Sequence, residues 1–161
     1  KHLQQVIARA GEGHLTNEKQ PILNTGVKEL LTILSASPNH RLGVLTGNLS
    51  VIAEEKLRRT GIRPYFTETF YSNGYFERAD LVRDAIQVCI TKYRLPGNGA
   101  VTIVGDTPRD VEAANRNEAE SIGVASGAYS VDKLKAAGAA KVFRSLEPSL
   151  ELLAALHLEV S

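Results

Sequence analysis

The sequence predicts an α/β fold built on a doubly wound parallel sheet. Short apolar runs typical of buried strands alternate with longer segments whose apolar residues recur at helical spacing. Gly, Pro and Asn residues separate these segments at the places where turns are expected. Alternation of this kind is typical of sheets whose strands run in the same direction. The 161 residues suffice for one domain with a substantial core.

The first twenty residues are predicted to lie outside that core. Residues 1–10 carry their apolar side chains at helical spacing, and we expect a helix there. Residues 11–20 are polar and contain glycine, which is typical of a linker. The core domain is therefore expected to span residues 21–161.

The first half of the core is predicted to contain three helices and two strands. The helices are expected at residues 27–34, 50–59 and 80–93, and the strands at 41–45 and 65–71. Ser50 is placed to cap the second helix, and Gly61 to end it. The inward face of the third helix is expected to carry Leu81, Val82, Ala85, Ile86, Val88 and Cys89.

The second half of the core continues the alternation of strands and helices. Strands are expected at residues 101–104, 121–124 and 141–143, and helices at 131–137 and 146–156. A further helix is expected to begin at Pro108, because proline suits the first turn of a helix.

The motif Gly105-Asp106-Thr107-Pro108-Arg109-Asp110 directly follows a buried-type strand. It brings two carboxylates, four residues apart, to a strand end and a helix start. Ligands of open α/β sheets bind at the carboxyl ends of strands, and Mg²⁺ commonly takes one or two carboxylates together with water. We therefore expect a Mg²⁺ site at Asp106 and Asp110. The alternative is that Asp106 caps the helix and Asp110 merely favours its N-terminus.

Thr46-Gly47-Asn48 follows another short apolar strand. A hydroxyl and backbone N–H groups at such a junction are good donors to a phosphate, although an ordinary turn with a helix cap would have the same sequence. Arg78 lies at a predicted helix start, where its charge opposes the helix dipole. It would therefore neutralise a bound anion, or else extend into solvent.

Composition excludes several classes of function. The formal net charge of +1 gives no electrostatic case for nucleic acid or an anionic membrane. The single cysteine, Cys89, permits no internal disulfide, so we expect a reducing, cytoplasmic setting, with Cys89 buried in its helix. The four histidines are scattered and are expected at the surface. Methionine is absent, which indicates that the chain begins inside a longer protein.

Taken in this order, four stretches resemble the haloacid dehalogenase-like superfamily in its phosphatase branch, with the nearest likeness to phosphoglycolate phosphatase-type hydrolases. They are residues 25–31, 42–48, 78–82 and 104–110. Residues 122–127 and 134–139 are also similar, so the likeness covers about residues 21–156. The resemblance implies a Rossmann-like core.

The resemblance also implies a role for each candidate residue. Thr46 would hydrogen-bond the transferring phosphoryl group, with Gly47 and Asn48 in the same substrate-binding loop. Arg78 occupies a position that is usually Lys and balances the charge of nucleophile and phosphate; Arg keeps the charge and changes the geometry. Asp106 and Asp110 would bind Mg²⁺.

The family's first motif, Asp-x-Asp-Gly-Thr, has no counterpart, because no Asp precedes Asp80. Its first Asp is the nucleophile that becomes an aspartyl-phosphate, and its second is the general acid and base. The resemblance implies that the family's central first strand and most of its cap domain are absent, with residues 1–10 as the last cap helix. A missing N-terminal segment or a partner's strand would have to fill the gap, because unpaired buried backbone groups are costly.

The function expected from these observations is a Mg²⁺-dependent phosphatase for a small phosphorylated metabolite. Its nucleophile would lie upstream of Lys1, and the chain alone would be inactive. One alternative is a metal-independent haloacid dehalogenase, against which the paired acids Asp106 and Asp110 argue. The other is a catalytically inactive relative that binds ligands or serves as a scaffold.

Overall fold

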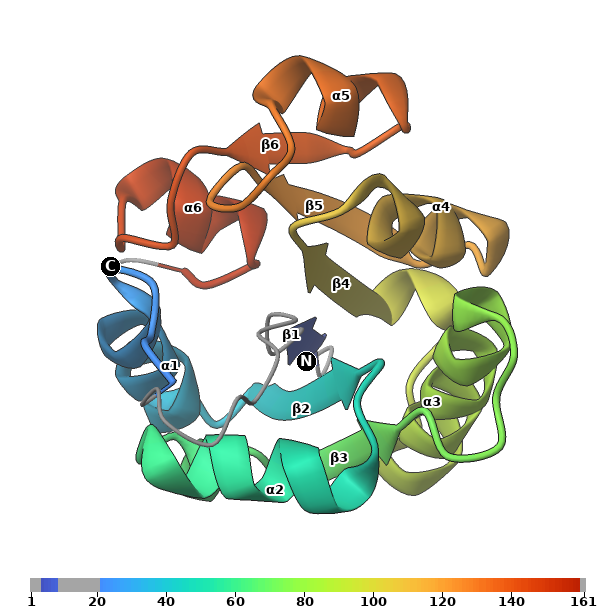
Figure 1. Cartoon of the computed structure of the whole chain (residues 1–161). Helices are drawn as coiled ribbons and strands as arrows, with labels where there is room; N and C mark the ends of the chain where they lie inside the picture. Colours follow the sequence, from blue (N-terminus) through green and yellow to red (C-terminus); the bar gives the residue numbers. More distant parts are fainter. Residues whose placement is uncertain (1–3, 9–20, 160–161) are drawn as a thin grey trace.

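The computed structural model describes residues 4–8 and 21–159. Within these residues, six parallel strands form one sheet in the order β3-β2-β1-β4-β5-β6 (Figure 1). The strands are β1 (Gln4–Ala8), β2 (His40–Thr46), β3 (Glu68–Tyr71), β4 (Val101–Gly105), β5 (Glu120–Val124) and β6 (Lys141–Phe143). The predicted parallel α/β architecture is therefore confirmed.

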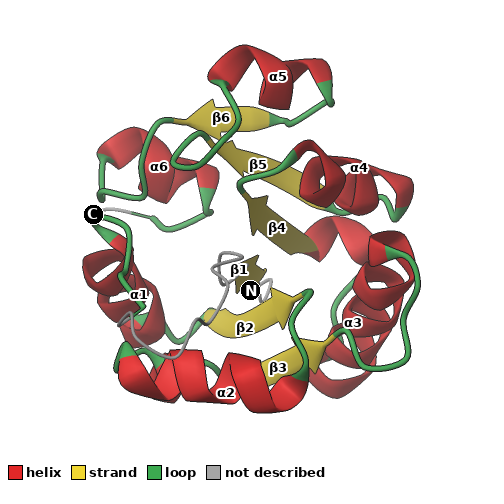
Figure 2. Ribbon diagram, viewed as in Figure 1, coloured by secondary structure: helices red, strands yellow, loops and turns green. Residues whose placement is uncertain are grey.

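Helices cover both faces of the sheet. They are α1 (Val27–Ala36), α2 (Ser50–Arg59), α3 (Arg78–Tyr93), α4 (Pro108–Arg116), α5 (Val131–Ala136) and α6 (Leu150–Ala155), with short 3-10 turns at Arg63–Tyr65 and Asn98–Ala100. Figures 1 and 2 show α1 and α6 on one face and α3 and α4 on the other, as the doubly wound prediction requires. Within the described part of the chain, every helix is too short or too polar to cross a lipid bilayer.

Each face of the sheet has its own apolar cluster. Leu34 of α1, Val44 of β2 and Leu152 of α6 are almost fully buried on one face. On the other face, Ile86 of α3 packs in the cluster that contains Ile103 of β4. Full burial of one such aliphatic side chain contributes about 1.5–3 kcal/mol. These two clusters hold the strand ends in fixed positions relative to one another.

The central strand is the main departure from the sequence prediction. Gln4–Ala8 form β1 between β2 and β4, so the predicted helix over residues 1–10 is wrong for this segment. Val6 pairs with Leu42 on one side and with Thr102 on the other. The backbone groups that β2 and β4 turn toward this position need partners, and only a strand supplies them all. The expected gap is thus filled by the chain's own residues, and the remainder of the predicted cap remnant (1–3 and 9–20) lies outside the described residues.

Other elements differ from the predictions in detail. Val88 was expected to face inward, and it is 46% exposed on the outer side of α3. Ser50 does not cap α2; it is the first helical residue, and its backbone N–H donates to Asn73 Oδ1 at 3.1 Å. Gly61 follows the end of α2 with a φ of 72°, as predicted for a residue that stops a helix.

Candidate functional site

Thr46 and Asp106 reach the same level at the carboxyl ends of β2 and β4. Ala8 of β1 pairs with Val44 on one side and with Val104 on the other. Thr46 and Asp106 each lie two residues beyond those partners, so the strand alternation brings both to one face at one height. With β1 between them, their backbones stand about 10 Å apart. Their predicted placement at strand ends is confirmed, whereas their roles stay predictions.

The loop after β2 folds back onto the Thr46 side chain. Thr46 is fully buried, and its Oγ1 accepts a hydrogen bond of 3.1 Å from the backbone N–H of Asn48. The Nδ2 atom of Asn48 is also buried and makes no hydrogen bond within the described residues. An unmet buried donor costs about 1–3 kcal/mol and requires a physical reason. A bound anion would supply the missing acceptor.

The loop after β3 holds this backbone in place. The Ser72 side chain donates to the Gly47 carbonyl at 2.7 Å, and the Ser72 backbone N–H donates to the Asn48 carbonyl at 3.4 Å. Asn73 accepts from the Ser50 N–H, as described above. No sequence pattern predicts this connection, because it joins loops that only the parallel pairing of β2 and β3 brings together.

Thr107 organises the acidic motif after β4. Its Oγ1 accepts from the Asp110 backbone N–H at 3.3 Å and donates to Asp110 Oδ2 at 2.8 Å. Thr107 is therefore the cap of α4, and the alternative in which Asp106 caps this helix is wrong. Gly105 lets the two elements approach, because a Cβ atom on it would lie only 2.3 Å from Asp110 Cβ. The motif thus places Asp106 outside the helix and Asp110 inside its first turn.

Arg78 and Asp110 form a buried ion pair. Arg78 Nε lies 3.1 Å from Asp110 Oδ1, and the two side chains are only 12% and 4% exposed. Arg78 begins α3 and Asp110 lies in the first turn of α4, so the pair joins the N-terminal ends of two helices. The alternative of a solvated Arg78 is wrong. The anion beside Arg78 is the carboxylate of Asp110, a residue of the chain itself, and the role of Arg78 toward a bound anion stays a prediction.

The acidic residues fit Mg²⁺ better than a metal that needs a full protein cage. No group of three or more His, Cys, Asp or Glu residues that could hold a metal occurs in the described part of the chain. Mg²⁺ requires only one or two carboxylates, with water completing its shell. Both carboxylate oxygens of Asp110 already have partners in Arg78 and Thr107. Asp106 is the candidate direct ligand because it lies at the strand end, outside the helix, and Asp110 is a candidate for an indirect role.

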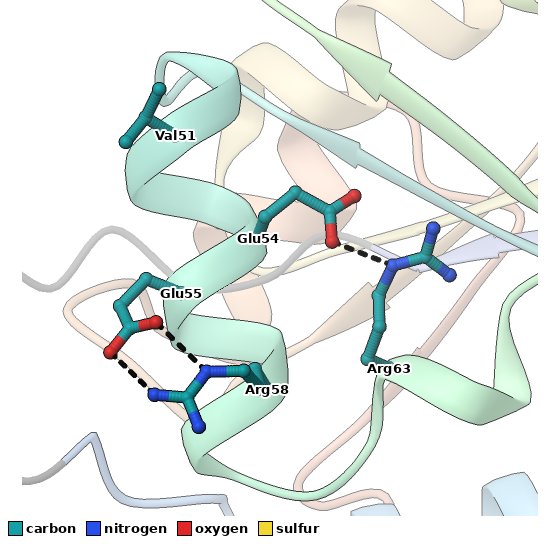
Figure 3. A pocket seen from close by; sticks show the side chains of 5 residues that line it. All are labelled: Val51, Glu54, Glu55, Arg58 and Arg63. Atoms are coloured by element: carbon teal, nitrogen blue, oxygen red, sulfur yellow. Dashed lines mark hydrogen bonds and ion pairs between the residues drawn. The ribbon is translucent and has the colours of Figure 1, made fainter.

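A depression of about 510 Å³ on the outer side of α2 is separate from these residues (Figure 3). Glu54 accepts hydrogen bonds from Tyr71 and Arg63, which lower its pKa, with the Tyr71 bond as the larger cause. Glu55 binds Arg58 across one helical turn. Because each charged residue that lines the depression already has an opposite charge beside it, the depression offers little to attract an ionic ligand.

Comparison with known proteins assigns the family. The sequence model of a family described as haloacid dehalogenase-like hydrolase matches residues 2–124. The chain belongs to this family. Family membership agrees with the sheet order and with the strand-end position of Thr46 and Asp106.

Solved structures agree with the family assignment. A predicted phosphatase from Clostridium acetobutylicum is 26% identical, with a TM-score of 0.69, over 83% of this chain and 59% of that one. A predicted phosphoglycolate phosphatase from Haemophilus somnus is 22% identical, with a TM-score of 0.70, over 81% and 57%. A haloacid dehalogenase-like family hydrolase from Streptococcus pneumoniae is 20% identical, with a TM-score of 0.69, over 81% and 58%. The chain therefore spans less than two thirds of these proteins.

A curated protein of another description shares part of the sequence. A probable glycine dehydrogenase (decarboxylating) subunit 1 from Thermoplasma acidophilum is 28% identical over 105 residues, which is 65% of this chain. The chain spans only 24% of that protein. A likeness to so small a part of a protein carries no argument about activity.

Proposed function

We propose that the intact protein is a Mg²⁺-dependent phosphatase that acts on a small phosphorylated metabolite. The observation that carries the proposal is the common level of Thr46 and Asp106 on either side of β1. The loop after one strand carries a buried amide donor, Asn48 Nδ2, that makes no hydrogen bond within the described residues, and an acidic loop follows the other strand. This arrangement suits a phosphoryl group held between hydrogen-bond donors and a cation.

Each candidate residue has its own role in the proposed phosphatase. The Thr46 hydroxyl and the Asn48 amide donate hydrogen bonds to phosphoryl oxygens, and Gly47 lets the loop turn between them. Arg78 adds positive charge, and Asp110 holds its guanidinium in place at 3.1 Å. Asp106 provides a carboxylate ligand for Mg²⁺, which when bound neutralises charge on the phosphoryl oxygens.

The nucleophile is the part of the mechanism that these residues do not provide. The five residues of β1, Gln-Gln-Val-Ile-Ala, include no acid, and no Asp precedes Asp80 in the sequence. We propose that the nucleophilic Asp lies upstream of Lys1 and forms an aspartyl-phosphate. One strand position exists between β2 and β4, so an upstream strand that carries this Asp would have to replace β1 there.

A second candidate is a relative that binds phosphate and Mg²⁺ without turnover. The occupation of the central position by a strand without acids favours it. The coding region upstream of Lys1 separates the two candidates. An Asp-x-Asp-Gly-Thr stretch there supports the phosphatase, and its absence supports the binding protein.

The experiment that tests the phosphatase measures hydrolysis of p-nitrophenyl phosphate by the protein extended to its natural start, as a function of Mg²⁺ concentration. Asp106→Asn should abolish Mg²⁺-dependent turnover, and Asp110→Asn should lower it less. Asp132→Asn, at an exposed position on α5, is the matched control and should leave turnover unchanged. Undiminished Mg²⁺-dependent turnover in Asp106→Asn would refute the proposal.

A further inference from the structure

The loop after β5 passes close to Asp106, so a side chain on Gly127 would crowd the Asp106 carboxylate. A Cβ atom placed on Gly127 would lie 3.2 Å from Asp106 Oδ2. Carbon and oxygen atoms that are not bonded rarely pack that closely, so one of them would have to move. Gly127 is not among the glycines with a positive φ, so the effect of a side chain here comes from the space it takes and not from the backbone conformation.

The loop itself is anchored on both sides of Gly127. The Ala125 backbone N–H donates to the Phe143 carbonyl at 2.8 Å, and Asn24 Nδ2 donates to Ser126 Oγ at 3.2 Å. On the other side, Ser130 caps α5 by accepting from the Lys133 N–H at 3.3 Å. A side chain at position 127 would therefore displace the Asp106 carboxylate more easily than the loop.

We infer that Gly127 is a positioning residue for the Asp106 carboxylate. The missing side chain lets Asp106 adopt the orientation from which it would bind Mg²⁺. Mg²⁺ demands ligand distances of about 2.0–2.1 Å in near-ideal octahedral geometry, so a shift of a few tenths of an ångström matters. This inference rests on the proposed function, since it assumes that Asp106 is a Mg²⁺ ligand.

The test compares two glycine-to-alanine variants of the 161-residue chain. Gly127→Ala introduces the contact with Asp106. Gly99→Ala is the matched control, because a Cβ atom there would have nothing within 4 Å. The melting temperature is recorded without Mg²⁺ and at increasing concentrations of Mg²⁺ alone, and the Mg²⁺ affinity is obtained from the shift.

The expected result is a loss of about tenfold in Mg²⁺ affinity for Gly127→Ala, the scale on which groups around a metal ligand act. Gly99→Ala should keep the wild-type affinity, and both variants should melt near the wild-type temperature without Mg²⁺. Gly127→Val, with a larger side chain, should lose more affinity than Gly127→Ala.

Two outcomes would contradict the inference in different ways. If the wild type binds Mg²⁺ and Gly127→Ala binds it equally well, the positioning role is wrong and the proposed function stands. If the wild type shows no shift with Mg²⁺ and the extended protein shows no Mg²⁺-dependent turnover, the proposed metal site fails, and the inference fails with it.

Discussion

Two arginine–carboxylate pairs in this molecule have similar distances and opposite surroundings. Arg78 and Asp110 lie 3.1 Å apart with side chains 12% and 4% exposed, and they join α3 to α4. Arg58 and Glu55 lie 2.9 Å apart with side chains 70% and 34% exposed, within one turn of α2. The shorter distance thus belongs to the pair that water surrounds, so distance does not rank the two pairs by importance.

Burial decides what happens when one partner is lost. When Arg58 is lost, water and salt ions take its place around Glu55, so the free energy of unfolding changes little. Around the buried Asp110, removal of Arg78 takes away an opposite charge that solvent replaces only poorly, although the hydrogen bonds with Thr107 remain. The buried pair therefore holds α3 and α4 in position relative to each other, whereas the exposed pair joins two side chains on the surface of α2.

The largest expected effect on stability comes from Arg78→Ala. We expect a loss of about 3 kcal/mol in the free energy of unfolding, because a buried carboxylate loses its partner. Urea unfolding of the 161-residue chain measures it. The double variant Arg78→Met with Asp110→Asn should recover much of the loss, since it removes the buried charge. A loss in Arg78→Ala no larger than that in Arg58→Ala would remove the contrast between the two pairs.

The same residue is expected to affect turnover in the intact protein. Arg78→Ala should lower it by about 2–4 kcal/mol of transition-state stabilisation, the scale of one well-placed electrostatic donor. Arg78→Lys should recover part of this, because the charge survives and the planar fork does not. Steady-state kinetics of the two variants measure the difference. Near-wild-type turnover in Arg78→Ala would restrict Arg78 to a structural role.

A smaller effect is expected from Gly105→Ala, which disturbs the buried pair without removing a charge. The added Cβ would lie 2.3 Å from Asp110 Cβ, so Asp110 must move away from Arg78 or the start of α4 must shift. Overpacking of this kind costs about 1–3 kcal/mol. Chemical denaturation beside the Gly99→Ala control measures it. Equal stability of the two variants would show that the close approach of β4 and α4 is dispensable.

The smallest effect concerns the exposed pair and its dependence on salt. Hydrogen bonds from Arg58 and then Arg59 lower the pKa of Glu55 from 4.5 to about 2. Because the pKa of Glu55 is lower in the folded state than in the unfolded state, its hydrogen bonds with Arg58 and Arg59 stabilise the folded state above the unfolded pKa. This stabilisation is lost as the pH falls toward 2. An NMR titration of the Glu55 carboxyl should show its midpoint rise toward 4.5 in about 1 M salt, where the screening length is ~3 Å. An unchanged midpoint would mean that the pair behaves as if it were buried.

The sequence was sufficient for most elements because their patterns are long or strongly marked. Most of α3, predicted over residues 80–93, and the apolar run of β4 were recognisable from periodicity and composition alone. The segment Gln4–Ala8 was not, because a short apolar run fits a buried strand as well as a helix. Its conformation is decided by β2 and β4, which lie far along the chain. His40 was expected at the surface for a similar reason, and it is buried with its Nε2 2.8 Å from the Leu156 carbonyl.

For the candidate site, the sequence predicted which side chains lie at strand ends. It did not predict which residues contact them. Thr46 and Asp106 follow apolar strands, so their edge of the sheet was predictable. The pairing of Arg78 with Asp110 depends on how α3 packs beside α4, and no local pattern encodes it. No sequence pattern singles out Gly127, and only its distance to Asp106 in space distinguishes it.

The position of β1 also bears on how the chain folds as it is synthesised. When the 161-residue chain is synthesised by itself, β1 leaves the ribosome before either of its neighbours. Val6 can pair with Leu42 first, and with Thr102 only much later. The half made of β2 and β3 can therefore form early, while the half made of β4, β5 and β6 arrives late. Contacts between distant residues slow folding, and an open strand edge invites pairing with other chains. The nascent chain is consequently most exposed to misassociation until the residues of β4 have emerged.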